Sequence, residues 1–263
     1  MQSNSRPLAL VTGASGGIGV DLARELARDG HDLILAARGV APMETLAAEL
    51  RGLGAAVAVM AADLSKPAAA TALAADIAAR GLTVDVLVNN AGLGAAGRFD
   101  GQTPERIDEV MQVNIVALTE LTRLLLPGMV ERRRGRIMLV ASVAAFQPGP
   151  RMAVYFASKA YVLSFGEALA YELRGTGVTV TTLCPGATAT NFFVAAGSSS
   201  TAIARRTGRM MRADVVARLG YRALVAGRSV VVTGLMNRIV ALGGRYAPHW
   251  LTLPVTDRMM ADD

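Results

Sequence analysis

The chain has 263 residues, of which 52% are hydrophobic and 18% charged, so it can bury a large core and is not disordered. Its mean hydropathy is +0.38, but charged residues interrupt every apolar stretch before it reaches the length of a membrane span. One cysteine excludes an internal disulfide, and two histidines leave too few ligands for a typical zinc site, so we expect no metal.

The net charge of +6 comes almost entirely from arginine, because Lys66 and Lys159 are the only two lysines. The basic run at 132–136 has no interleaved aromatic residues, so we expect no nucleic-acid partner. The polar N-terminus runs directly into an apolar stretch without the hydrophobic region of a signal peptide. We therefore expect a cytoplasmic protein without a membrane partner.

Short apolar stretches alternate with amphipathic stretches along the chain. The predicted strands are 8–12, 32–37, 56–62, 84–89, 136–142, 178–184 and 229–233. The predicted helices are 17–29, 42–53, 67–80, 104–131, 152–174 and 213–226. Strands that are apolar throughout are buried on both faces, which is typical of a parallel sheet covered by helices. The pattern predicts a single doubly wound α/β domain over 1–263, a three-layer sandwich around a seven-stranded parallel sheet.

A glycine-rich turn follows the first predicted strand. Residues 12–19 read TGASGGIG and lead directly into a helix. Glycines let backbone N–H groups approach a phosphate at a helix N-terminus, where the helix dipole favours an anion. The spacing differs from the common GxGxxG pattern, and a purely structural turn is the alternative.

Polar residues end the next strands. Arg38 follows the second strand, where an NAD site carries an acidic residue, so the sequence favours the 2′-phosphate of NADP(H). A solvated arginine is the alternative. Asp63 ends the third strand, where a carboxylate can accept a hydrogen bond from an adenine amino group or form a turn. Asn89 and Asn90 end the fourth strand and can satisfy backbone groups beside a cofactor.

Tyr155 and Lys159 are four residues apart in a predicted helix and therefore share one face. A cation about 5 Å from a phenol favours the phenolate by roughly 3 kcal/mol, or about two pKa units. This spacing predicts a tyrosine that acts as a general acid–base near neutral pH. Ser142 ends the fifth strand, at the sheet edge where ligands bind, and can hold the same substrate oxygen.

These motifs together resemble the short-chain dehydrogenase/reductase family, in its compact single-domain branch. TGASGGIG, NNAG at 89–92, Ser142, YFASK at 155–159 and Pro185-Gly186 occur in the order and spacing of that family, over residues 7–235. The resemblance implies a Rossmann-type fold with strand order 3-2-1-4-5-6-7. It also implies an NADP(H)-dependent oxidoreductase that interconverts a carbonyl and an alcohol, and a homodimer or homotetramer.

The resemblance assigns roles to individual residues. Tyr155 becomes the general acid–base, Lys159 lowers its pKa and holds the nicotinamide ribose, Ser142 orients the substrate, and Asn114 supports a proton relay. The residues expected at the cofactor are Gly13, Ser15, Gly17, Ile18, Gly19, Arg38, Asp63, Leu64, Asn90, Ala91, Gly92, Tyr155, Lys159, Pro185, Gly186, Thr188 and Thr190. Gly16 departs from many NADP(H)-preferring members, which carry a second basic residue there, so that preference rests mainly on Arg38.

The substrate side is less defined. The irregular segment 191–211 is expected to form a lid, and the apolar residues near it favour a hydrophobic carbonyl or alcohol. The residues expected at the substrate are Leu93, Val143, Phe146, Met152, Phe192 and Phe193. The C-terminal extension 235–263 could cover the pocket, pack on a partner subunit or lie on a membrane surface, and packing is favoured. A non-catalytic NADP(H)-binding sensor on the same fold is the alternative function.

Overall fold

The computed structural model describes residues 6–198, 201 and 210–261. Seven strands form one sheet in the order β3-β2-β1-β4-β5-β6-β9, and every neighbouring pair is parallel. The predicted fold class and strand order are therefore confirmed. The strands are β1 (Leu8–Thr12), β2 (Asp32–Ala37), β3 (Val57–Ala61), β4 (Val86–Asn89), β5 (Gly135–Val140), β6 (Val178–Cys184) and β9 (Val230–Val232).

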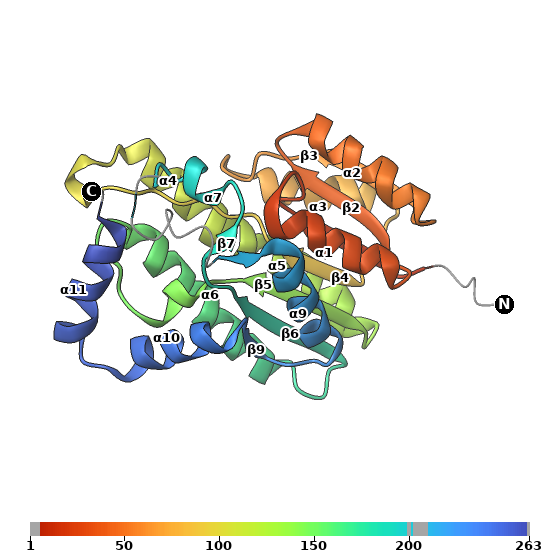
Figure 1. The fold of residues 1–263 in the computed structure, drawn as a ribbon. Coiled ribbons are helices and arrows are strands. Elements are labelled where there is room, and N and C mark those ends of the chain that lie inside the picture. The colour runs from red at the N-terminus through yellow and green to blue at the C-terminus, as the bar shows by residue number, and fades with distance from the viewer. Residues whose placement is uncertain (1–5, 199–200, 202–209, 262–263) are drawn as a thin grey trace.

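Helices cover both faces of this sheet (Figure 1). One layer holds α1 (Gly17–Arg28), α2 (Val40–Gly52) and α9 (Ala213–Val225). The opposite layer holds α3 (Ala69–Ala79), α5 (Leu118–Glu131) and α6 (Ala153–Glu172). Each βα connection places a helix N-terminus at the carboxyl edge of the sheet, where ligands bind in folds of this type.

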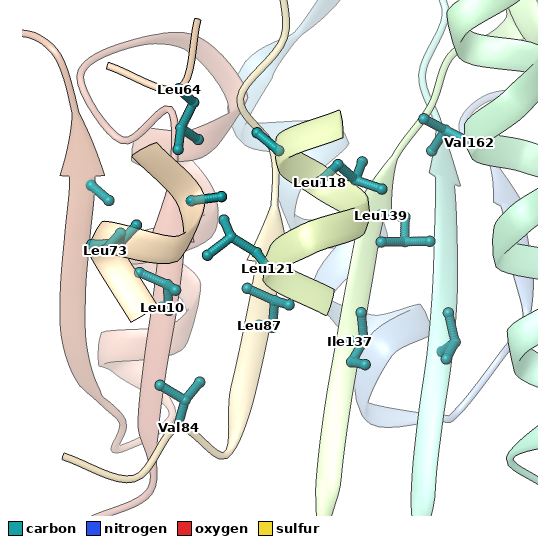
Figure 2. Close-up of a cluster of buried hydrophobic side chains, with 14 of the residues drawn as sticks. Leu10, Leu64, Leu73, Val84, Leu87, Leu118, Leu121, Ile137, Leu139 and Val162 are labelled. Atoms are coloured by element: carbon teal, nitrogen blue, oxygen red, sulfur yellow. The ribbon is translucent and has the colours of Figure 1, made fainter. Parts of the chain in front are cut away.

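The core consists of two apolar clusters, one on each face of the sheet. Alternate residues of a strand point to opposite faces, so Leu10 lies in one cluster while Ala9 and Val11 lie in the other. Figure 2 shows the cluster that contains Leu10, with Leu118 and Leu121 of α5 lying over the strand residues of the sheet. Both faces are thus fully covered, which explains why the strands are apolar throughout.

The long helix expected over 104–131 is interrupted. The structure has α4 (Pro104–Met111), a π-helical segment η2 (Gln112–Ala117) and then α5. By length and composition this stretch, with a mean hydropathy of 1.4, could span a membrane. Its α5 part is a core helix, because Leu118, Leu121 and Met129 are buried against the sheet.

Three features beyond the sheet are absent from the sequence-based prediction. Two short strands, β7 (Thr188–Ala189) and β8 (Met211–Arg212), pair in parallel and join the two ends of the expected lid. A short helix, α7 (Phe192–Ala195), begins that segment, while residues 199–200 and 202–209 of the expected lid lie outside the described part. The C-terminal extension forms α10 (Leu235–Tyr246) and α11 (His249–Met260).

Candidate active site

The glycine-rich turn after β1 is held tightly against the end of β4. Gly13 has φ +66°, and a Cβ there would lie 2.9 Å from Ala91 Cα. The hydroxyl of Thr12 accepts hydrogen bonds of 3.1 Å from the backbone N–H groups of both Asn90 and Ala91. The Asn90 side chain donates to the carbonyls of Thr12 at 2.9 Å and Gly13 at 3.2 Å. These bonds fix the turn at the N-terminus of α1.

Gly19 lies inside this packing. A Cβ at Gly19 would meet both the Asn90 amide and the Gly13 carbonyl at 2.5 Å, so only glycine lets α1 approach the turn. Gly16 is different, because a Cβ there would meet nothing within 4 Å. The turn is therefore closed towards the protein and open on the side where α1 begins.

Arg38 and Asp63 lie at the ends of β2 and β3. Arg38 is exposed and lines the cleft described below. Burial alone would raise the pKa of Asp63, but hydrogen bonds from Ser65 and the nearby charge of Arg38 outweigh burial and lower it. The carboxylate of Asp63 is thus held by Ser65, and Arg38 supplies a positive charge at the rim.

The residues expected to carry the chemistry meet where β5 ends and α6 begins. The Nζ atom of Lys159 lies 5.8 Å from the ring centroid of Tyr155 and donates a 2.8 Å hydrogen bond to the Val140 carbonyl. The hydroxyl of Ser142 donates a 3.5 Å bond to the Pro185 carbonyl and accepts a 3.1 Å bond from the Ala144 backbone N–H. These bonds hold the serine beside Tyr155, whose pKa it lowers.

The protonation balance in this cluster is governed mainly by burial. Burial raises the pKa of Tyr155 to about 12, and the interaction with Ser142 offsets this only in part. Burial also lowers the pKa of Lys159 to about 8. Loss of water penalises both charged forms, and the lowering of the tyrosine pKa by Lys159 stays a prediction. Tyr155 therefore holds its proton at neutral pH.

Asn114 lies in the π-helical segment η2 and is 1% exposed. Its side-chain oxygen accepts a 2.8 Å bond from the Leu93 backbone N–H, and its nitrogen donates 2.9 Å bonds to the Leu93 carbonyl and the Ser158 hydroxyl. Ser158 in turn donates a 2.7 Å bond to the Tyr155 carbonyl. Asn114 does not line the cleft, and its side chain instead joins the loop after β4 to the helix that carries the tyrosine.

All these elements border one cleft of about 440 Å³. Every residue expected at the cofactor lines it except Gly19. Of the residues expected at the substrate, Phe146 does not line the cleft, because its ring packs against the larger core cluster. The other five do line it, namely Leu93, Val143, Met152, Phe192 and Phe193.

Helix α11 supplies a wall of the cleft, so the C-terminal extension covers the pocket, which was one of the three alternatives expected for it. Thr256, Met259 and Met260 line it from a position more than 90 residues beyond Tyr155 in the chain. The Gln147 side chain donates a 3.0 Å bond to Thr256, and Arg151 pairs with Asp257 at 2.8 Å. The motif residues gave no indication of these contacts, since only the three-dimensional path of the extension brings them together.

The two ends of the cleft fit the two ends of a dinucleotide. The open turn at Gly16, the helix N-terminus and Arg38 suit phosphate groups. The buried lysine and the tyrosine–serine pair lie at the opposite end, beside the apolar wall. The fold and site together define an oxidoreductase with a dinucleotide cofactor.

Comparisons with known proteins define the family. The short chain dehydrogenase family model matches residues 7–200. The chain is 37% identical over 188 residues to a protein named as a ketoacyl reductase from Streptomyces coelicolor, covering 71% of this chain and 72% of the relative. It covers 62% and 58% of two further curated relatives. The chain belongs to the short-chain dehydrogenase/reductase family.

Solved structures agree with this assignment. A short-chain dehydrogenase from Sphingobium yanoikuyae in complex with NADPH is 34% identical, with a TM-score of 0.80 over 90% of this chain and 92% of that one. A short-chain dehydrogenase/reductase from Burkholderia phymatum in complex with NAD is 29% identical, with a TM-score of 0.80 over 92% and 94%. Similar folds thus bind either nucleotide.

Proposed function

We propose that this protein catalyses reversible hydride transfer between NADP(H) and a hydrophobic carbonyl/alcohol pair. The observation that carries the proposal is the meeting of Tyr155, Ser142 and Lys159 in the cleft that also holds the glycine-rich turn and Arg38. One cofactor and one substrate bound together would occupy both ends of the cleft. The ketoacyl reductase relative and the NADPH-bound neighbour support the proposal.

The glycine-rich turn and Arg38 would hold the phosphate end of NADPH, which would supply the hydride for reduction of the carbonyl carbon. The phenol of Tyr155 donates its proton to the carbonyl oxygen as negative charge develops there. The Ser142 hydroxyl donates a hydrogen bond to the same oxygen and stabilises that charge. The raised pKa of Tyr155 suits this direction, because the proton donor is fully occupied at neutral pH.

Lys159 and Asn114 support the tyrosine. Lys159 is fixed to β5 by its bond to the Val140 carbonyl, so its ammonium lies beside the ring where phenolate charge forms. Nearby positive charge favours the phenolate and eases proton release. Asn114 holds the loop after β4 and, through Ser158, the first turn of α6. We assign Asn114 a positioning role and retain the proton relay as a prediction.

The cofactor preference rests on Arg38. No acidic residue ends β2, where a carboxylate would bind the ribose hydroxyls of NAD and repel a 2′-phosphate. Arg38 is exposed at that position, and its guanidinium can form charge-assisted hydrogen bonds to a phosphate. NADP(H) is therefore the cofactor that we propose.

The substrate end of the cleft is apolar. Four residues of a small buried cluster line it, namely Ala144, Met152, Phe156 and Met260, with Phe192 against them. The Phe192 ring lies 5.2 Å from that of Tyr155, so an apolar group bound there reaches the proton donor. This composition supports a bulky hydrophobic ketone, aldehyde or secondary alcohol as substrate.

A substrate panel tests the proposal. Ketones, β-ketoacyl thioesters, steroids and sugars are offered with NADPH, and the fall in NADPH absorbance is followed. We expect turnover on hydrophobic ketones or thioesters above that on sugars. Tight NADPH binding without oxidation on any of them would favour the sensor instead. A cytoplasmic homodimer or homotetramer remains a prediction that sedimentation of the protein would test.

A further inference from the structure

The helices α10 and α11 form an outer layer at the cleft end of the molecule (Figure 1). Their outward faces carry many large apolar side chains. Nine large hydrophobic side chains there are 42–76% exposed, and we call them the C-terminal patch. The patch consists of Leu235, Met236, Ile239, Val240, Leu242, Tyr246, Trp250, Leu251 and Val255.

Both helices turn large apolar side chains outwards, although α11 also carries the buried Met260 on its inward side. In α10 the buried residues are the small Ala241 and Gly244, and a Cβ on Gly244 would lie 2.9 Å from the Gln147 side chain. In α11 the inward residues include Thr252 and Thr256, while Trp250 on the opposite side is 76% exposed. A helix that packs only on its own protein shows the reverse pattern.

The patch is too large to be ordinary surface. By usual side-chain areas the nine exposed fractions amount to on the order of 1000 Å² of apolar surface, above the roughly 300–600 Å² of the largest patch on a typical monomer. Among the residues that the structure describes, none covers these side chains. Exposed apolar surface of this extent on two neighbouring helices is typical of an interaction site.

Charge distinguishes between a second copy of the chain and a lipid surface. Arg238, Arg245 and Arg258 are exposed on the same two helices, and residues 235–256 contain no acidic residue. Asp257 is already paired with Arg151, and Arg245 reaches Glu167 only at 3.8 Å. A symmetric contact through this patch would bring two sets of these arginines into one interface, with no carboxylate from residues 235–256 to neutralise them. An anionic surface complements them.

We propose that the C-terminal patch docks the protein onto the surface of an anionic phospholipid bilayer. Amphipathic helices with arginines beside an apolar face and exposed aromatic residues lie in the bilayer interface in this way. Tyr246 and Trp250, at the junction of α10 and α11, are 75% and 76% exposed and supply such aromatic residues. This departs from the expectation of no membrane partner, and it does not depend on the reaction proposed above.

Docking places the cleft beside the lipid. The face of α11 opposite the patch contributes Thr256, Met259 and Met260 to the cleft wall. One helix thus contacts the bilayer on one side and the cleft on the other. An apolar compound dissolved in the membrane would have a short path to the Tyr155 end.

Trp250 is the only tryptophan of the chain and lies within the patch, so its fluorescence reports docking directly. The purified full chain is mixed with vesicles of equal parts phosphatidylcholine and phosphatidylglycerol, and separately with pure phosphatidylcholine vesicles. We expect a blue shift of emission and co-flotation with the anionic vesicles, both weakened by added salt. No shift and no flotation with the anionic vesicles would overturn the proposal.

Variants distinguish binding through the C-terminal patch from non-specific adsorption to vesicles. Ile239→Ser with Leu242→Ser keeps the tryptophan reporter, and we expect vesicle affinity to fall about tenfold or more. Arg238→Gln with Arg245→Gln should weaken binding to anionic vesicles by roughly thirtyfold and remove most of the preference over phosphatidylcholine. Phe99→Ser with Tyr171→Ser removes two equally exposed rings outside the patch and should bind as the unaltered protein does.

Fold and association are checked on the same samples. Each variant must keep the NADPH affinity and melting temperature of the unaltered protein, because its altered side chains are exposed. Sedimentation velocity is measured without vesicles. If the isoleucine–leucine double variant dissociates an oligomer while the unaltered protein ignores anionic vesicles, the patch is a contact between copies and the membrane proposal is wrong. Equal vesicle binding by that variant and the Phe99/Tyr171 control would also overturn it.

Discussion

The Nζ atom of Lys159 lies 5.8 Å from the ring centroid of Tyr155, one helical turn away, and is bonded to the carbonyl of Val140 at the end of β5. This places a buried cation beside a half-buried phenol. Burial acts against the charged form of both, raising the pKa of Tyr155 to about 12 and lowering that of Lys159 to about 8. Burial of these two groups therefore lowers the unfolding free energy when either is charged, and two measurements test this.

The first concerns stability and pH. The folded-state pKa of Lys159, about 8, lies below its ordinary value of 10.5. Below pH 8 the folded protein bears the full penalty of a buried cation, and between about pH 8 and 10.5 the unfolded chain binds more protons, so stability rises with pH. Lys159→Met removes this penalty and also the bond to the Val140 carbonyl, so we expect its unfolding free energy, relative to the unaltered protein, to be most favourable at pH 7 and to fall towards pH 10. Urea titrations at several pH values measure this. A pH-independent difference would contradict the assignment.

The second concerns the reaction. Alcohol oxidation needs the phenolate of Tyr155, whose pKa in the free protein is raised to about 12. We therefore expect kcat/KM for oxidation to rise with pH through the alkaline range, because the phenolate fraction rises. Reduction needs the phenol and should not lose its proton donor between pH 6 and 8. Profiles in both directions, on a substrate from the panel, check this. A value of kcat/KM for oxidation that is constant from pH 7 to 10 would argue against Tyr155 as the group that accepts the proton.

Cofactor choice depends on one exposed arginine. Arg38→Asp removes a cation that can meet the 2′-phosphate and supplies a carboxylate that can bind ribose hydroxyls. The ratio of kcat/KM for NADPH over NADH should fall by roughly 100-fold. Arg28→Asp reverses an equally basic exposed residue outside the cleft and should leave the ratio unchanged. An unaltered ratio in Arg38→Asp would remove the arginine from nucleotide recognition.

The turn beneath the cofactor depends on the hydroxyl of Thr12, which accepts bonds from two backbone N–H groups and donates a 3.3 Å bond to the Val88 carbonyl. Thr12→Val keeps the shape but leaves these groups without their partner. We expect the unfolding free energy to fall by about 2–4 kcal/mol and NADPH affinity to fall with it. Thr45→Val, at an exposed helical position, is the control. Equal stability of the two variants would show that the hydroxyl is dispensable.

The repeating pattern of apolar strands and amphipathic helices was enough to predict the sheet and its covering. Leu10 and Val11, on neighbouring positions of β1, lie in different core clusters, as expected of a strand buried on both faces. The site motifs are local, and each sits at a strand end, so the sheet brings them together. Three features could not be read in this way. The break at Asn114 depends on tertiary packing, and the wall from Met260 depends on the path of the extension. The pKa of Tyr155 depends on burial, which a spacing does not reveal.

The central claim is that Tyr155 is the proton donor, and replacing it by phenylalanine tests this most directly. Tyr155→Phe keeps the ring and its contact with Phe192 and removes only the hydroxyl. We expect NADPH affinity within about twofold of the unaltered protein and a fall in kcat of at least about 100-fold, in line with loss of a general acid. If Tyr155→Phe converts a substrate identified in the panel at the same rate as the unaltered protein, the mechanism proposed for this site is wrong.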